Sequence, residues 1–449
     1  MCSKCGGAAC ACRGNSHGVE ILAEAEILPS HQSIFPGLSY SEFVVVRCLE
    51  IVLHNAISIR GAARIIALFT HATPVHTTIR WWLLRLGYYK LTRPKAKGDW
   101  VWFADHSIQL GDQKVLMIVG LPLHQLPPKG QALTQRDLEP LALLPVTTSN
   151  GTVVKGQLQD LVRVTGAPRA VVADQGSDLQ AGISEFIKTH PKTIRIIDVK
   201  HKGASVLKKH LNQTDTWSEF VSASSQCRQR LQQTPMAKVA PPNQRSKSRY
   251  MNADKLTEWA ERQLCLQRKH TSTLGDLGVN REELSRELGW LRGYKKQIPD
   301  WSASVRIVQT ATRKIAEDGY YPGVANQMKR VLRGLSAGPT SRHVRKEILA
   351  FVQTQERQAK LKSHERLPGS TESLESTFGT LKHIEGDQAS QGFTPLVLAA
   401  PATLSETSTQ VVGEALRTVN TSTVKSWIDE HFSETLGSAR RLLNAAAKG

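Results

Sequence analysis

The sequence lacks three features that would each point to a particular class of protein. No apolar run among its 449 residues approaches the roughly 18 needed to cross a bilayer, so a membrane protein is not expected. The N-terminus lacks the charged-then-apolar layout of a secretory signal peptide. Acidic residues are in the minority, with 39 Asp and Glu against 58 Lys and Arg, and the net charge is +19. Since such a balance is typical of proteins that meet a polyanion, we expect a cytoplasmic, nucleoid-associated protein.

Cysteine is scarce and unevenly placed, because four of the seven lie within the first dozen residues. The spacing of Cys2 and Cys5 suits a zinc ion, whereas Cys10 and Cys12 are closer than is usual for zinc ligands. The surrounding Gly and Ala favour a flexible Cys-rich tail over residues 1–38, and a zinc site is the less favoured interpretation. An odd cysteine count without a signal peptide also indicates a reducing compartment.

Three short helices are predicted next. Apolar periodicity indicates them at residues 40–54, 59–68 and 77–86. Ser58 can cap the second, and Gly87 is expected to stop the third. With a tight turn between the last two, residues 39–90 predict a helix-turn-helix module, although an ordinary three-helix bundle fits the same pattern. On the first interpretation the last helix offers donors to phosphates and base edges, namely Thr77, Thr78, Arg80 and Arg85.

The centre of the chain begins with two strand-like apolar runs. Residues 100–108 and 115–121 are separated by the turn-like Leu110–Gln113, so they predict a β-hairpin. Asp105 lies in the first run, and an Asp among aromatic and aliphatic strand residues costs free energy unless something charged pairs with it. A bound metal ion is one such partner, and other carboxylates should then approach Asp105.

Strands and helices alternate after the hairpin. The predicted elements are a strand at 141–146, a helix at 152–164, a strand at 169–174, a helix at 179–189 and a strand at 193–198. This order indicates a mixed α/β sheet, which would occupy residues 98–203. Asp174 and Asp198 each end a strand, and ligands usually bind at that edge of such sheets.

Strand signals disappear between residues 204 and 365, which predicts an all-helical insertion. No acid occurs between Glu219 and Asp254, and prolines are present, so this piece predicts a basic loop in contact with phosphate. Its basic residues include Arg228, Arg230, Lys238, Arg245, Lys247 and Arg249. A solvated charge run without a function is the alternative.

A helix resumes within residues 366–392, where Ser370 or Thr371 can cap it. Close to one face of this helix lie Glu375, Phe378 and Lys382. Residues 393–449 predict a C-terminal helical extension.

These stretches resemble the DDE-type DNA transposases, in particular insertion-sequence transposases with an RNase H-like core. The resemblance rests on residues 102–111, 171–178 and 375–382, and on Asp198-Val-Lys-His201. The last is similar to the Cys/Asp-x-x-His signature of Mutator-type transposases, which also carry an all-helical insertion before the catalytic Glu. The resemblance covers roughly residues 40–400. It implies an α/β fold, an RNase H-like mixed sheet interrupted by an all-α insertion and preceded by an all-α helix-turn-helix module.

The resemblance also implies an activity. Phosphodiester bonds at the ends of a mobile element would be hydrolysed, and the freed 3′-hydroxyls would be transferred into target DNA. Asp105, Asp174 and Glu375 would hold two Mg²⁺ or Mn²⁺ ions, because attacking and leaving oxygens on opposite sides of phosphorus both need a hard cation. The partner would be double-stranded DNA. A dimer or larger homo-oligomer is expected, since two ends must be cut and joined together.

Several of these residues have competitors. Asp178 competes with Asp174 as second ligand, although it is better placed to cap the next helix. Candidates for the third ligand are Glu372, Glu375 and Glu385.

The auxiliary residues have two interpretations each. Asp198 is either a helper near the ions or a helix cap, and His201 either positions DNA or packs. Lys200 and Lys382 either contact phosphate or are solvated.

Two other functions share these sequence features. A catalytically inactive, transposase-derived DNA-binding regulator would be indifferent to Mg²⁺ and to acid-to-amide changes. An RNase H-like nuclease without strand transfer would use the same acids but would not need paired DNA ends.

Overall fold

The computed structural model describes residues 33–447, except for residues 56, 71, 109–113, 244–251, 387–393 and 433–435. Several predictions fall on residues outside this set. They concern most of the tail over 1–38 with its four cysteines, the turn Leu110–Gln113, and the basic residues Arg245, Lys247 and Arg249.

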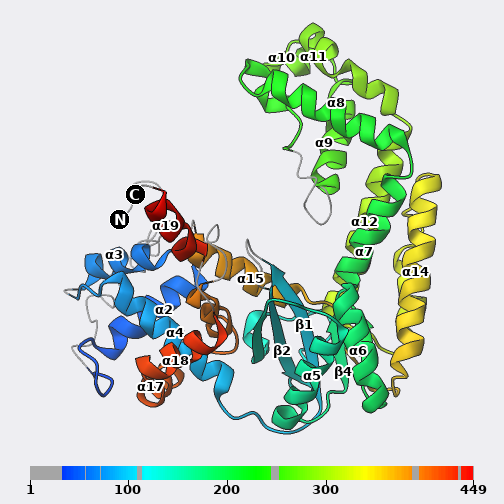
Figure 1. The fold of residues 1–449 in the computed structure, drawn as a ribbon. Coiled ribbons are helices and arrows are strands. Elements are labelled where there is room, and N and C mark those ends of the chain that lie inside the picture. The colour runs from blue at the N-terminus through cyan, green and yellow to red at the C-terminus, as the bar shows by residue number, and fades with distance from the viewer. Residues whose placement is uncertain are drawn as a thin grey trace, which may run out of the picture.

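A five-stranded mixed sheet lies at the centre of the molecule (Figure 1). Its strands are β1 (Trp100–Ile108), β2 (Lys114–Pro122), β3 (Glu139–Val146), β4 (Ala170–Ala173) and β5 (Ile194–Ile197). The order is β3-β2-β1-β4-β5, with β1–β2 and β2–β3 antiparallel and β1–β4 and β4–β5 parallel. The predicted hairpin and mixed α/β sheet are confirmed, and the arrangement is compatible with an RNase H-like core.

Both faces of the sheet are covered, which explains why its strands are continuous apolar runs. Helices α5 (Gly151–Thr165) and α6 (Ser177–Thr189) cover one face over a core that includes Trp102, Leu158 and Phe186. On the other face lie α14 (Pro339–Ala359), packed against β5, and α15 (Glu372–Glu385), packed against β1.

A helical arm rises from the sheet between β5 and α15 (Figure 1). Besides α14 it contains α7 (Val199–Leu211), α8 (Asp215–Leu231), α9 (Ala253–Leu266), α10 (Thr271–Asp276), α11 (Arg281–Leu288), α12 (Gln297–Asp318) and α13 (Val324–Val331). The long helices α7, α12 and α14 pack on one another and carry α8–α11 at the far end. Trp217, Phe220 and Trp301 pack there with ring centroids 5.0–5.7 Å apart, so the end of the arm has its own aromatic core.

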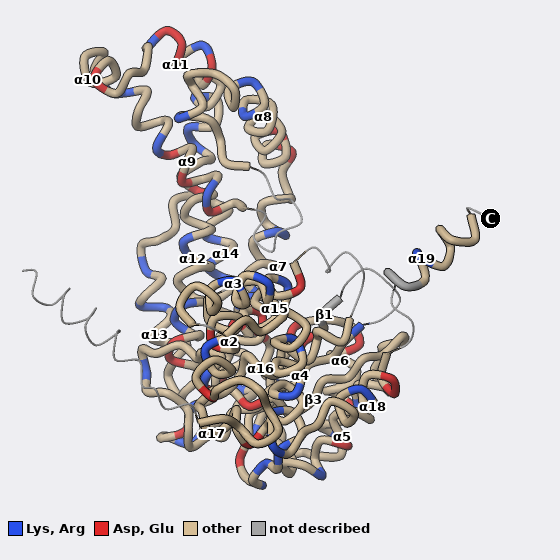
Figure 2. The backbone as a smooth tube through the Cα atoms, turned by 90° about the vertical axis from the view of Figure 1, so that its left-hand side faces the viewer, with Lys and Arg blue, Asp and Glu red and all other residues tan. Residues whose placement is uncertain are grey.

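The predicted basic loop is partly wrong. Arg228 and Arg230 lie on α8, which continues to Leu231, because the buried residues Ser224, Cys227 and Leu231 maintain one apolar stripe along it. Lys and Arg recur along the arm and over the central body rather than on one element (Figure 2).

The N-terminal and C-terminal helices form one body beside the sheet (Figure 1). The N-terminal ones are α2 (Glu42–His54), α3 (Ile59–Phe69) and α4 (His76–Thr92), and the C-terminal ones are α16 (Ala399–Ala402), α17 (Thr409–Thr418), α18 (Thr421–His431) and α19 (Leu436–Ala446). Helix α4 packs against α16, α17 and α18, so the N-terminal helices are completed by residues more than 300 positions away.

The prediction that Gly87 ends the third helix is wrong. Gly87 lies inside α4, where an added Cβ would be 1.8 Å from the carbonyl oxygen of Leu398. The glycine therefore permits close approach of two backbones rather than marking a helix end.

Seven of the 17 residues of α4 are buried and most of the others are half-buried, which limits its use as a DNA-recognition helix. Along its length Ile79, Trp82 and Leu86 are at most 2% exposed, whereas His76 and Thr77 in the first turn are exposed.

Among the described helices, none is long and apolar enough to span a membrane.

Candidate active site

Three aspartates lie side by side where the parallel strands end. The register pairs Ala104 with Ala173 across β1 and β4, and Ala173 with Ile197 across β4 and β5. The next residue on each strand is an acid: Asp105, Asp174 and Asp198. Side chains alternate along a strand, so these acids point toward the face that carries Phe103 and Val172. The sheet register alone thus brings together three segments that are far apart in the sequence.

Asp198 is the N-cap of α7 rather than a free carboxylate. Its Oδ1 accepts a hydrogen bond from the backbone N–H of His201 at 2.6 Å. Its Oδ2 accepts two more, from the backbone N–H and the hydroxyl of Thr371, at 2.5 and 2.7 Å. The side chain is fully buried, and these donors stabilise its charge. Of its two predicted roles, the structure supports the cap, and through Thr371 this cap also fixes the start of α15.

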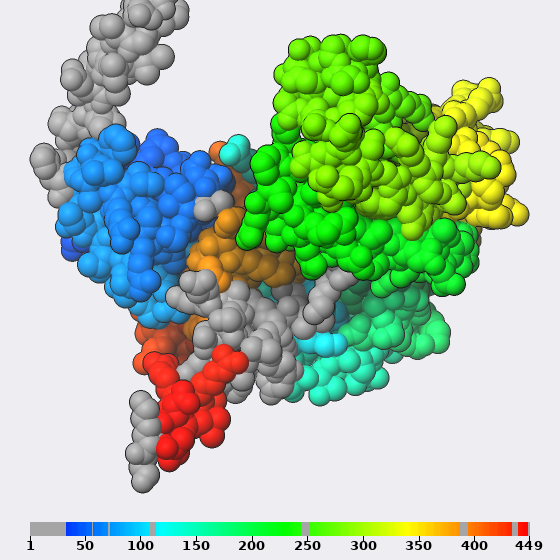
Figure 3. All heavy atoms as spheres, turned by 90° about the horizontal axis from the view of Figure 1, so that it is seen from above, coloured from blue at the N-terminus to red at the C-terminus, as the bar shows by residue number. Residues whose placement is uncertain are grey.

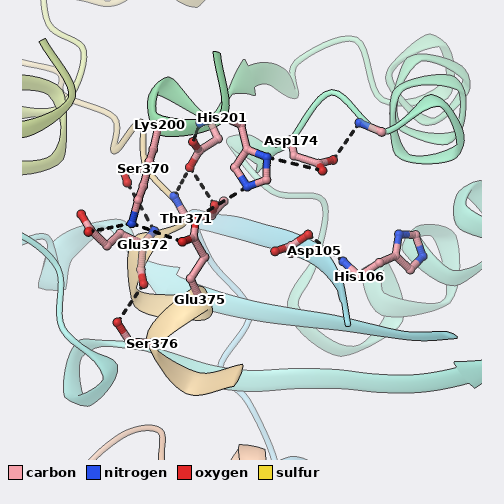
Figure 4. Close-up of polar contacts among 12 residues, drawn as sticks. Asp105, His106, Asp174, Lys200, His201, Ser370, Thr371, Glu372, Glu375 and Ser376 are labelled. Atoms are coloured by element: carbon pink, nitrogen blue, oxygen red, sulfur yellow. Dashed lines mark hydrogen bonds and ion pairs between the residues drawn. The ribbon is translucent and has the colours of Figure 1, made fainter. Parts of the chain in front are cut away.

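Glu375 reaches the aspartates because of that connection. Thr371 occupies the N-cap position of α15, and Glu375 lies in the first turn, with its carboxylate facing α7 (Figure 4). His201 lies between the two elements, with Nδ1 3.7 Å from Asp174 Oδ2 and Nε2 3.6 Å from Glu375 Oε1. Its Nε2 is buried and has no hydrogen-bond partner among the described residues. One imidazole therefore connects the second and third predicted acids.

Lys200 adds an ammonium group to this site. Its ammonium lies 2.9 Å from Glu372 Oε1 and 3.2 Å from Glu375 Oε2 (Figure 4). Lys200 is therefore engaged by two carboxylates, and its phosphate contact stays a prediction.

Asp105 and Asp174 are held by local backbone groups. Asp105 is 9% exposed, and its Oδ1 accepts a hydrogen bond of 2.8 Å from the N–H of His106. Asp174 Oδ1 accepts one of 2.9 Å from the N–H of Gly176, in the loop that leads into α6. Both carboxylates therefore have restricted orientations at the end of the sheet.

The donor chemistry of this edge suits a hard divalent cation, because Mg²⁺ and Mn²⁺ prefer carboxylate oxygens. In the described ranges, no three His, Cys, Asp or Glu side chains lie close enough together to hold a metal ion as they stand. Instead, Lys200 and His201 lie among the carboxylates. The carboxylates fit such an ion by their chemistry, while in this structure an ammonium and an imidazole lie next to them.

The competing acids are in different environments. Glu372 is about half exposed, and Glu385 is buried at the other end of α15. Asp178 does not cap α6, because that helix begins earlier, at Ser177 after Gly176. Glu375 therefore remains the candidate third acid, and Asp174 the candidate second one.

Asp178 belongs instead to a polar cluster that was not predicted from the sequence. Ser149 Oγ lies 2.6 Å from Asp178 Oδ2 and 3.2 Å from His106 Nε2, and Lys114 Nζ is 3.9 Å from the same carboxylate. Burial raises the pKa of Asp178, but its hydrogen bonds and the neighbouring cations outweigh this and lower it. Burial is also the main cause of the lowered pKa of His106. Since His106 follows Asp105 directly, strand alternation could have placed it on the opposite face.

The predicted DNA contacts divide into two groups. Thr77, Thr78 and Arg80 lie in the first turns of α4, and Lys382 is exposed on α15. Arg85 is engaged within the chain, because its guanidinium donates to the backbone carbonyls of Leu416 and Val419 at the end of α17. These carbonyls have no partner within their own helix, and the arginine satisfies them.

On the arm, two further predicted contacts are engaged within the chain. Arg228 donates to the carbonyl oxygen of Pro241 at 2.7 Å, and Arg230 lies 3.6 Å from Glu287.

Helix α15 is exposed between the N-terminal helices and the arm (Figure 3). The acids on and beside its first turn are thus close to a surface that a large partner could reach.

Comparison with known proteins finds a distant likeness among solved structures. No protein-family model and no curated protein matches the chain. Among solved structures, it is similar to a chain of the Drosophila P element transposase strand transfer complex, with 11% sequence identity and a TM-score of 0.40. The likeness covers 91% of this chain and 100% of that one. A likeness of this size carries no argument about function, which must be proposed from the geometry of the site.

Proposed function

We propose that the chain is a DDE-type DNA transposase with an RNase H-like core. It hydrolyses phosphodiester bonds at the ends of a mobile element and transfers the 3′-hydroxyls into target DNA. The observation that carries this proposal is the convergence of Asp105, Asp174 and Glu375 at one edge of a mixed sheet. Two come from adjacent parallel strands, and the third from a helix that follows a long helical arm.

In this proposal the three acids hold two Mg²⁺ or Mn²⁺ ions. When bound, such ions activate an attacking oxygen and stabilise a leaving one. Asp198 positions the helices by capping α7 and binding Thr371 at the start of α15. His201 orients Asp174 and Glu375 toward each other. Lys200, once released from Glu375, offers its charge to the phosphate of a bound strand.

The proposed partner is double-stranded DNA, as element ends and as target. The net charge of +19 supports this, because phosphate neutralisation supplies most of the affinity of such complexes. A homo-oligomer, at least a dimer on DNA, and a cytoplasmic, nucleoid-associated location belong to the same proposal.

A second candidate function is favoured by one observation. Lys200 and His201 lie among the acids, which is the arrangement expected of a site that never binds metal. A transposase-derived regulator would then bind DNA without cutting it. A nuclease that cuts but does not join ends is the third candidate, and the same experiment separates all three.

The experiment is cleavage and joining of a labelled duplex that carries the element end, with Mg²⁺ or Mn²⁺. It compares wild type with Asp105→Asn, Asp174→Asn and Glu375→Gln. We expect each variant to bind DNA like wild type and to lose at least about a thousandfold in cleavage rate. Glu372→Gln is the matched control, because Glu372 also contacts Lys200 but is about half exposed. This variant should cleave DNA at a rate within about tenfold of that of wild type.

The outcomes are distinct for each function. Cutting and joining by wild type alone supports the transposase. Cutting without joining supports the nuclease. Tight binding by wild type without any cutting rejects the enzyme and leaves the regulator. Normal cutting by the three variants rejects Asp105, Asp174 and Glu375 as the active site.

A further inference from the structure

A cavity lies at the C-terminal end of α15, away from the acids of the candidate active site. Its volume is about 540 Å³, which is within the range of ligand sites. It is lined by residues from three elements: the start of α3, the start of α4 and the C-terminal end of α15. The segment 394–396 completes its wall.

Four basic side chains converge on this cavity. Arg60 comes from α3, His76 and Arg80 from α4, and His383 from α15. Among the described lining residues, Glu385 is the only acid; it is 3% exposed and takes part in an interaction of its own. The cavity is therefore basic even when both histidines are neutral.

These basic side chains have no partner in the described part of the chain. No hydrogen bond or ion pair engages Arg60, Arg80, His76 or His383, in contrast to Arg85 and Lys200. Arg80 is partly buried, and burial alone lowers the pKa of its guanidinium. A partly desolvated arginine without a counter-ion is stabilised when an anion enters.

The backbone at the cavity also favours an anion. Helix α4 begins there with 17 residues, and its N-cap, Val75, has no side chain that can bond the free N–H groups of the first turn. The hydroxyl of Thr77 lies in the same turn. Positive helix ends and guanidinium groups both suit the binding of phosphate in proteins.

We propose that this cavity binds backbone phosphates of duplex DNA. Arg60 and Arg80 carry most of the contact, and His76, Thr77 and His383 complete it. The inference rests on the proposed function and adds to it a defined contact on α15, the helix that carries Glu375. Glu375 and His383 are eight residues apart on this helix, or about 12 Å along its axis. That distance equals the axial rise of about three to four base pairs of DNA.

The test measures DNA affinity rather than activity, so it needs no knowledge of the element end. A labelled random-sequence duplex is titrated with wild type, Arg60→Gln and Arg80→Gln at several salt concentrations. We expect each variant to bind about tenfold more weakly at 0.1 M salt and to reduce the salt-dependence slope by about one. Arg64→Gln is the matched control, because Arg64 is exposed on the same helix as Arg60 but does not line the cavity.

Each outcome decides the proposal. Equal affinity and salt slope for Arg60→Gln and Arg64→Gln overturn it, even when wild type binds DNA and cuts it. If Arg60→Gln and Arg80→Gln bind inorganic sulfate more weakly than wild type but bind DNA equally well, the cavity takes a small anion. That result also overturns the proposal. If the two cavity variants lose affinity while Asp105→Asn still cuts, the cavity stands and the proposed active site fails. Thermal unfolding of Arg60→Gln, at an exposed position, controls for misfolding.

Discussion

At the scale of single residues, the acids of the candidate site differ in what they do for the chain. Asp198 is fully buried and bonded by three donors, so it is part of the framework. Asp174 faces the imidazole of His201, and Glu375 faces both this imidazole and the ammonium of Lys200. Removal of the Asp198 carboxylate should therefore lower the stability of the fold. Changes around Asp174 and Glu375 should instead alter the binding of a metal ion.

Asp198→Asn tests the framework role. The amide keeps the shape but places an N–H₂ group where two carboxylate oxygens accept from three donors, so at least one buried donor loses its partner. We expect a loss of about 2 kcal/mol in the free energy of unfolding, measured by urea denaturation. Asp160→Asn, at a position 73% exposed, should change it by less than about 0.5 kcal/mol. Equal stability of the two variants would contradict the role.

Lys200→Met tests whether this lysine substitutes for a metal ion. Without the ammonium, Glu372 and Glu375 lose one neighbouring positive charge, and a divalent cation should bind more tightly. We expect the dissociation constant for Mn²⁺, measured by calorimetry, to fall about fivefold, which corresponds to about 1 kcal/mol. The metal-free variant should also unfold at a lower temperature. Lys208→Met on the exposed side of α7 is the control, and the same affinity in both variants would reject the idea.

At the scale of elements, the sheet could be predicted because its strands are continuous apolar runs bounded by turn residues. The sequence also predicted the helix at Glu375 and the cap at Ser58, which rest on local patterns. The roles of Arg85 and Gly87 could not be predicted, because their partners lie more than 300 residues away. The register that aligns Asp198 with Asp174 is a property of the folded sheet, and no local pattern carries it.

Two glycines in helix interiors predict opposite effects of the same substitution. Gly87→Ala would place a Cβ against the backbone carbonyl of Leu398, so we expect it to destabilise the protein by about 2–3 kcal/mol. Gly379→Ala on α15 meets no atom within 4 Å and should stabilise by about 0.5–1 kcal/mol. Chemical denaturation measures both. A Gly87→Ala protein as stable as wild type would mean that α4 and Leu398 do not pack as described.

At the scale of the whole molecule, the N-terminal and C-terminal helices hold each other through buried polar contacts. Lys90 is fully buried in α4, and its ammonium donates to the carbonyls of Ala402 and Leu404 and to the Thr407 hydroxyl, at 2.6–3.1 Å. Lys90 thus joins the N-terminal helices to the C-terminal ones.

Lys90 should also make stability depend on pH. Burial lowers its pKa from 10.5 to about 7, so between these values the unfolded chain binds a proton that the folded chain does not. Stability should therefore rise with pH from about 7 to 10.5, with a slope of at most about 1.4 kcal/mol per pH unit. Urea denaturation at several pH values measures this slope. Lys90→Met should abolish it and Lys97→Met, at an exposed position, should not; an unchanged slope in Lys90→Met would contradict the assignment.

The contact between α4 and α16–α18 has a consequence for how the protein is made. When Thr92 leaves the ribosome, roughly 300 residues must still be translated before α16 can cover α4. At bacterial or eukaryotic synthesis rates this takes about 15 to 60 s, during which Trp82, Leu86 and their neighbours lack their final cover. The nascent chain is thus exposed to aggregation for most of its synthesis. A premature stop codon before residue 399 should yield insoluble protein, even though it spares every acid of the candidate site.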